Sequence, residues 1–187
     1  MINDCIKKAV DILLNGGVVL YPTDTVWGIG CDATNPDAIE RIFQIKKRAE
    51  AKALIILLDN KNRLETYVEK IPDITWNLID CFEKPLTIIY PKGKNIAPNL
   101  LAEDGSIAIR ITREKFSRSL CRAFQKPLVS TSANISGKAS PRNFSEVSAD
   151  IRAQVDYILP FRRNEDILST PSTIIRVGMR GDFRFVR

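Results

Sequence analysis

Short apolar runs alternate with amphipathic helical patterns along the chain. Continuous runs rich in Val, Ile and Leu predict strands at residues 18–21, 53–58, 86–90, 107–111, 128–130, 157–159, 173–177 and 183–186. Apolar residues at helical spacing predict helices from residue 3 or 4 to Gly16, from Pro36 to about Lys46, and over 64–68, 74–82, 114–124 and 143–155. Some neighbouring strands have no helix between them. The pattern therefore predicts one α/β domain over residues 1–187, with a twisted mixed β-sheet flanked by helices.

Composition narrows the class of protein without choosing a function. A chain of 187 residues with 44% hydrophobic and 27% charged residues is ordinary for a globular domain. No apolar run approaches the length of a membrane span, and the N-terminus lacks the pattern of a signal peptide. We therefore expect a cytoplasmic protein with no membrane partner.

The charged and metal-binding residue types exclude several chemistries. Lys and Arg number 28 against 22 Asp and Glu, and the net charge of +6 favours anionic partners such as nucleotides and RNA. The chain has no histidine, and its four cysteines are scattered without a C-x-x-C pair. This argues against a zinc site and excludes catalysis by Cys–His or Ser–His pairs.

Small hydroxyl and amide side chains gather where two predicted strands end. Ser130, Thr131, Ser132 and Asn134 follow one apolar run. Thr23 and Thr25 follow another, in a segment where Gly28 and Gly30 permit close backbone approach. Such groups either cap local turns or hold a small polar ligand or anion. We expect Asp24 and Asp32 to cap turns, in preference to an outer role around a bound metal ion.

Basic residues occupy two further positions of interest. Lys46 and Arg48 lie at the end of a predicted helix, and Arg110 interrupts an apolar strand. Each has a structural explanation when taken alone, as a solvated helix end or an edge-strand arginine. Arg110 is flanked by isoleucines, so we expect it to have a partner or a ligand. Arg176, a similar strand arginine outside these motifs, is assigned a structural role.

Together, in this order, these segments resemble the YrdC-like family, whose enzymatic members are threonylcarbamoyl-AMP synthases. The K-x-R motif of the family reads Lys46 and Arg48, its strand arginine is Arg110, and its S-x-N motif reads Ser132 and Asn134. The segments 22–25 and 172–174 also match, and the resemblance runs from about Gly17 to the C-terminus. It implies a single YrdC-like domain in the short form, without the extra C-terminal domain of longer members.

The chain departs from the family pattern at two positions. Many members have proline after the K-x-R arginine, where this chain has Ala49. Many also have a histidine at the end of the following strand, where this chain has Leu57. The second departure puts the details of the amino-acid pocket in doubt more than the activity itself.

The resemblance implies a reaction that joins L-threonine, bicarbonate (or carbon dioxide) and ATP to give threonylcarbamoyl-AMP and pyrophosphate, for the N6-threonylcarbamoyladenosine modification of tRNA. Mg²⁺ is expected with ATP and no metal site built by the protein; downstream tRNA threonylcarbamoyl-transfer proteins are expected partners. The implied residues are, for catalysis, Lys46 and Arg48; for threonine, Thr23, Arg110, Thr131 and Ser172; for ATP, Lys46, Arg48, Ser106, Ser132, Asn134, Ser140 and Arg187.

Two other functions remain open from the sequence. The excess of Lys and Arg over Asp and Glu also fits a double-stranded RNA-binding protein. A carbamoyl-transfer domain of the hydrogenase-maturation type would share the fold, although that activity normally occurs in a longer chain beside other domains.

Overall fold

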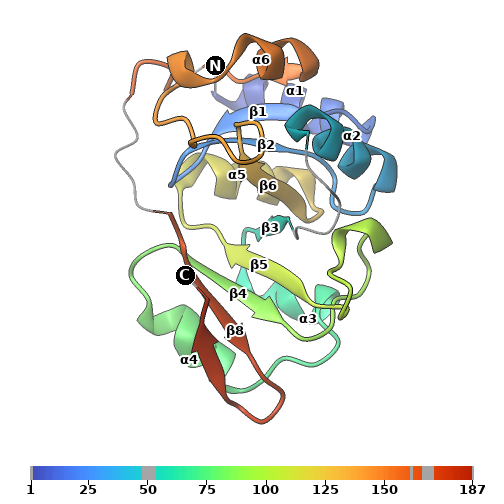
Figure 1. Cartoon of the computed structure of the whole chain (residues 1–187), viewed down its shortest axis with the longest axis vertical. Coiled ribbons are helices and arrows are strands. Elements are labelled where there is room, and N and C mark those ends of the chain that lie inside the picture. The colour runs from blue at the N-terminus through green and yellow to red at the C-terminus, as the bar shows by residue number, and fades with distance from the viewer. Residues whose placement is uncertain (1, 48–53, 161, 166–170, 187) are drawn as a thin grey trace.

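A mixed β-sheet forms the centre of the molecule (Figure 1). The computed structural model describes residues 2–47, 54–160, 162–165 and 171–186. Within these residues the strand order is β7-β1-β2-β6-β3-β5-β4-β8-β9. The strands are β1 (Val19–Pro22), β2 (Trp27–Gly30), β3 (Ile55–Leu58), β4 (Leu86–Tyr90), β5 (Ile107–Ile111), β6 (Leu128–Ser132), β7 (Tyr157–Ile158), β8 (Thr173–Val177) and β9 (Phe183–Phe185).

Helices lie on both faces of this sheet. The α-helices are α1 (Ile2–Leu14), α2 (Pro36–Lys46), α3 (Leu64–Tyr67), α4 (Ile74–Cys81), α5 (Lys115–Phe124) and α6 (Ala149–Gln154). Short 3-10 turns occur at η1 (Lys61–Arg63), η2 (Pro98–Leu100) and η3 (Phe144–Glu146). The predicted α/β class with a mixed sheet and flanking helices is confirmed.

Strand β6 joins the two halves of the sheet. It pairs antiparallel with β2 on one side and with β3 on the other. Parallel pairs occur between β1 and β7, β3 and β5, and β4 and β8. Since β6 connects strands from both halves, the residues at its end lie near the middle of the sheet.

Two apolar clusters hold the helices against opposite sheet faces. One cluster packs α1 and α5 on the face that carries Val19, Tyr21, Leu57 and Leu128. The larger cluster includes α2, α3 and α4. It also includes strand residues whose side chains point to the other face of the sheet, such as Ile56 and Val129. Figure 1 shows α1 and α5 beside the half of the sheet that contains β1, and α4 beside β4 and β8. Among the described residues, α1 and α5 thus cover one face of the β1 half, whereas α4 lies against the opposite face of the β4 half.

Most predicted elements are present within a residue or two of their expected bounds. The Asn35 side chain accepts from the backbone N–H groups of Asp37 and Ala38, and Pro36 is the first residue of α2, as expected from the sequence. The predicted strand at 53–58 is described from Ile55, and its first residue lies outside the described residues. The predicted helix at 143–155 is wrong as one element: Ser148 caps α6 after a separate 3-10 turn.

Strand β2 was not predicted from the sequence. It contains two glycines in four residues, which weakens any local preference for a strand. Its pairing with β1 and β6 determines its conformation instead. A glycine is required at position 30, since a Cβ atom there would lie 2.3 Å from the carbonyl oxygen of Val129.

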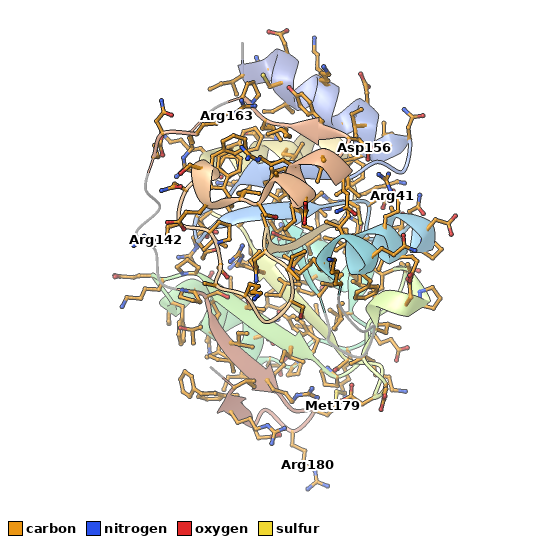
Figure 2. The ribbon with its side chains drawn as sticks, turned by 45° about the horizontal axis from the view of Figure 1, so that its top comes forward. Arg41, Arg142, Asp156, Arg163, Met179 and Arg180 are labelled. Carbon is orange, nitrogen blue, oxygen red and sulfur yellow. The ribbon has the colours of Figure 1, made fainter. Side chains whose placement is uncertain are left out.

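An ion pair joins α2 to the residue that precedes β7. Arg41 Nη1 lies 2.8 Å from Asp156 Oδ2, and the same carboxylate oxygen accepts from the backbone N–H of Val18 at 2.7 Å. Figure 2 shows Arg41 and Asp156 next to each other, while Met179 and Arg180 lie at the tip of the β8–β9 hairpin. Among the described residues, every helix is too short or too polar to cross a membrane.

We predict that Gly30→Ala prevents stable folding, because β6 leaves no space for a methyl group. The expected loss of unfolding free energy is at least about 3 kcal/mol, at the upper end for overpacking. Gly28→Ala is the milder comparison, because a Cβ atom there would lie 3.2 Å from the carbonyl oxygen of Thr131. A loss of about 1 kcal/mol is expected for this variant. Urea denaturation followed by circular dichroism measures both. Equal stability of the two variants would contradict the packing described here.

Candidate functional site

A cavity of about 340 Å³ lies on the sheet face that carries Ile55, Ala108 and Arg110. Its volume falls in the range of small-molecule sites. Six residues predicted from the sequence line it: Thr23, Arg110, Thr131, Ser132, Ser140 and Ser172. The rest of the lining is Thr25, Val26, Gly28, Leu54, Ile55, Ile89, Ala108, Ser130, Pro171 and Ile174. The cavity thus combines an apolar floor with several hydroxyl groups and one guanidinium group.

The turn after β1 holds the first hydroxyl groups. Thr23 Oγ1 accepts from the backbone N–H groups of Thr25 at 3.1 Å and Val26 at 3.2 Å, and donates to the Val26 carbonyl oxygen at 2.7 Å. Because these bonds use the hydroxyl fully, Thr23 shapes the turn and lines the cavity chiefly with its other atoms. The neighbouring Thr25 hydroxyl lies 3.1 Å from it and was not among the predicted site residues.

Arg110 is the charged group of the cavity. It is 5% exposed, on the face of β5 that carries Ala108 and opposite Leu57 of β3. Its Nη2 lies 3.3 Å from Asp24 Oδ1, and its Nη1 donates to Thr25 Oγ1 at 3.5 Å. Its Nε is buried without a hydrogen-bond partner. A buried guanidinium with spare donors beside a cavity is suited to a carboxylate or phosphate ligand.

Hydroxyl groups of β4, β6 and the segment before β8 surround this arginine. β6 extends two residues further than predicted, so Thr131 and Ser132 belong to the strand and pair with β2. Ser172 Oγ lies 2.9 Å from Thr87 Oγ1, a buried contact that holds the start of β8 against β4. Ser130, also in the lining, belongs to the hydroxyl cluster noted in the sequence, although the family resemblance did not imply it as a site residue.

Lys46 lies beneath the cavity rather than in its lining. It is 2% exposed, and its Nζ donates to the carbonyl oxygens of Ser132 at 2.5 Å and Asn134 at 2.7 Å. The backbone N–H of Ser136 in turn donates to the Lys46 carbonyl oxygen at 2.9 Å. The end of α2 is therefore fastened to the turn after β6, and Lys46 supports the predicted S-x-N segment from below.

Asn134 and Ser106, which were also predicted for the site, lie outside the cavity lining. The Asn134 amide group donates to the carbonyl oxygens of Ile135 and Lys138, while its own Oδ1 is buried without a hydrogen-bond partner. Ser106 is buried beside Arg176, whose Nη2 donates to it at 3.4 Å. Arg48 and Arg187 lie outside the described residues.

Local hydrogen bonds and burial shift the pKa values of Asp104, Tyr21 and Cys121. Hydrogen bonding from Ser106, followed by that from Arg176, lowers the pKa of Asp104 to about 2. Burial raises the pKa of Tyr21, which lies in the apolar cluster with Leu57 and Leu128, and raises that of Cys121 to about 12. Among the described residues, no group of three or more acidic or cysteine side chains is placed to hold a metal ion. The polar side chains that the described residues place in this cavity are hydroxyl groups and the Arg110 guanidinium.

Comparison with known proteins identifies the relatives of this chain. The model of the Sua5/YciO/YrdC family, whose description reads telomere recombination, matches residues 11–187. The chain belongs to the Sua5/YciO/YrdC family. It is 37% identical over 174 residues to threonylcarbamoyl-AMP synthase of Pseudoalteromonas translucida, covering 90% of this chain and 91% of that protein. It is 33% identical over 159 residues to threonylcarbamoyl-AMP synthase of Photobacterium profundum, covering 83% and 86%.

A solved family structure shares the fold and contains an amino acid. The crystal structure of P. abyssi Sua5 complexed with L-threonine superimposes with a TM-score of 0.84 at 29% sequence identity and covers 92% of this chain. This chain spans 50% of the length of that Sua5 chain. The resemblance to the YrdC-like family expected from the sequence is confirmed.

We predict that Lys46→Met destabilises the protein in the absence of any ligand. The substitution leaves two carbonyl oxygens without the ammonium group, at a cost of about 1–3 kcal/mol for each one that stays unpaired. Urea denaturation of the unliganded protein measures the loss. Lys47→Met is the matched control, because Lys47 is exposed at the C-cap of α2, and a change within about 0.5 kcal/mol is expected. An unchanged or higher stability of Lys46→Met would contradict the anchoring role.

Proposed function

We propose that this protein is an L-threonylcarbamoyladenylate synthase. It would act in the cytoplasm and join L-threonine, bicarbonate (or carbon dioxide) and ATP, releasing pyrophosphate and threonylcarbamoyl-AMP for the N6-threonylcarbamoyladenosine modification of tRNA. The observation that carries the proposal is the buried Arg110 guanidinium, with an unpartnered Nε, beside a cavity lined by hydroxyl groups. The curated relatives named threonylcarbamoyl-AMP synthase support it.

Arg110 would bind the carboxylate of threonine. Its spare donors favour a planar anion with two oxygens. The hydroxyl groups of Thr131 and Ser172, together with the walls of the Thr23 turn, would orient the rest of the amino acid. The P. abyssi Sua5 structure, which is complexed with L-threonine, supports an amino acid as the ligand of this cavity.

The nucleotide would bind toward the end of β6 and the turn that follows. It would contact Ser106, the Ser132 hydroxyl, Asn134 and Ser140. Positive charge would also come from Arg48 and Arg187, which are not among the described residues. Lys46 would act with Arg48 in catalysis. Its ammonium group, which donates to the carbonyl oxygens of Ser132 and Asn134, would hold the S-x-N segment in place. ATP would arrive with Mg²⁺, for which the phosphates and water supply most ligands.

The chemistry itself requires positioning more than proton transfer. The threonyl carbamate attacks the α-phosphorus, an oxygen–phosphorus bond forms, and pyrophosphate leaves with the bonding electron pair. Such a displacement is accelerated mainly by orientation and by neutralisation of charge. A site with guanidinium and hydroxyl groups and no histidine suits this demand.

The overall reaction is the first test. Purified protein supplied with ATP, Mg²⁺, bicarbonate and L-threonine is expected to release pyrophosphate and to form threonylcarbamoyl-AMP, detected by mass spectrometry. Omission of threonine or of bicarbonate is expected to abolish the product. Pyrophosphate release at the same rate without threonine would overturn the proposal, and so would RNA binding without any synthesis.

A second test concerns the carboxylate contact. Arg110→Gln is expected to weaken L-threonine binding by about 1.5–3 kcal/mol, the value of a charge-assisted hydrogen-bonded contact, and to leave ATP affinity unchanged. Arg176→Gln is the matched control, because Arg176 is a strand arginine paired with Asp104 outside the cavity lining. Isothermal titration calorimetry gives both affinities. Equal threonine affinity in Arg110→Gln and the unmodified protein would mean that this arginine serves another role.

A further inference from the structure

Asp24 supplies the negative charge nearest to Arg110 among the described residues. The two side chains are 3.3 Å apart between Arg110 Nη2 and Asp24 Oδ1, and both are largely buried, at 6% and 18% side-chain exposure. The contact lacks hydrogen-bond alignment, since Asp24 Oδ1 is buried without a hydrogen-bond partner. The pair therefore balances charge while leaving the hydrogen-bonding capacity of both groups partly unused.

The turn after β1 places Asp24 for this contact. An aspartate in such a turn normally accepts from the backbone two residues on, as Asp32 does from the Thr34 N–H at 2.8 Å. At Asp24 the Thr23 hydroxyl takes this local role by accepting from the N–H groups of Thr25 and Val26. The Asp24 carboxylate is thereby free to reach Arg110, contrary to the turn-capping role expected from the sequence.

The two side chains of this pair line different cavities. Asp24 lines a second cavity, of about 430 Å³, together with Ile109, Ile111 and Glu114, whereas Arg110 lines the candidate site. Asp24 is thus outside the lining in which a ligand of Arg110 would bind. The unpartnered Nε and the remaining N–H groups are left for the carboxylate of the ligand.

The Asp24 carboxylate has opposite effects on the stability of the empty site and of the occupied site. A buried guanidinium without an anion is costly, so Asp24 stabilises the empty protein. A ligand carboxylate bound to the same guanidinium would lie within a few ångströms of the Asp24 carboxylate, and like charges at this range repel strongly in a poorly solvated site.

We propose that Asp24 is the internal counter-ion of Arg110, which stabilises the empty site and lowers its affinity for a carboxylate ligand. Asp24 is a positioning residue rather than a catalytic one, because it acts through Arg110. The identity of the ligand as threonine rests on the proposed function, whereas the competition between two carboxylates does not. Threonylcarbamoyl-AMP retains the carboxylate of threonine, so the same repulsion would favour release of the product.

Asp24→Asn separates this role from a purely structural one, because it keeps the shape and removes the charge. The urea midpoint of the unliganded variant is expected to fall, while the Kd for L-threonine falls by about tenfold, equivalent to about 1.4 kcal/mol. 1-Amino-2-propanol, which lacks the carboxylate, is expected to show no such gain. Asp80→Asn is the control: Asp80 on α4 forms an exposed ion pair with Lys61 of η1, and neither quantity should change.

A weaker or unchanged threonine affinity in Asp24→Asn would overturn the inference, whatever happens to the urea midpoint. If Asp24→Asn does not fold, the double variant Asp24→Asn/Arg110→Gln decides, since removal of both charges should restore a folded protein. Failure of the double variant to fold would also overturn it.

Acetate distinguishes this inference from the proposed function. If the unmodified protein does not bind threonine, the proposed function fails, and acetate then serves as a bare carboxylate probe. A larger acetate-induced rise in the midpoint of Asp24→Asn than of the unmodified protein would support the counter-ion role; an equal rise would refute it.

Discussion

The position of β6 between β2 and β3 is the constraint on which the site depends. This strand is antiparallel to both neighbours and joins two halves of the sheet that would otherwise be separate. Its first residues, Leu128 and Val129, are fully buried on opposite faces, so apolar packing fixes its register on both sides. The same register carries Ser130, Thr131 and Ser132 to the edge of the cavity. The hydroxyl groups of the site are thus placed by the core.

Charge in the site is balanced by the protein itself before any ligand binds. Lys46 is neutralised in part by carbonyl dipoles at the turn after β6, and Arg110 by the carboxylate of Asp24. The contact between Arg110 and Asp24 lacks ideal hydrogen-bond geometry. Such a partner offsets part of the cost of the buried guanidinium in the empty protein and leaves donors of Arg110 for an incoming anion.

Local sequence signals predicted the regular elements well and the contacts between them poorly. β4, β5 and β8 were predicted with their observed bounds, because each is a continuous apolar run, and Asn35-Pro36 predicted the start of α2. β2 was missed because its glycines give no local signal, and the break at Ser148 was missed because apolar spacing continued across it. The resemblance to the family motifs identified six residues that line one cavity. It did not reveal that Lys46 lies beneath that cavity or that Asp24 faces Arg110, since both depend on residues distant in the sequence.

Several of the polar contacts that define the site join distant parts of the chain. Lys46 reaches carbonyl groups 86 and 88 positions later, Arg110 contacts a hydroxyl 85 positions earlier, and Thr87 meets Ser172 across 85 positions. Contacts of such long sequence separation carry a large loop-closure entropy and slow the folding of a domain. The binding cavity consequently has no local nucleus of its own and forms only once both halves of the sheet have assembled. A nascent or fragmented chain with native helices would therefore still lack the site, and ligand binding reports on completion of the whole fold.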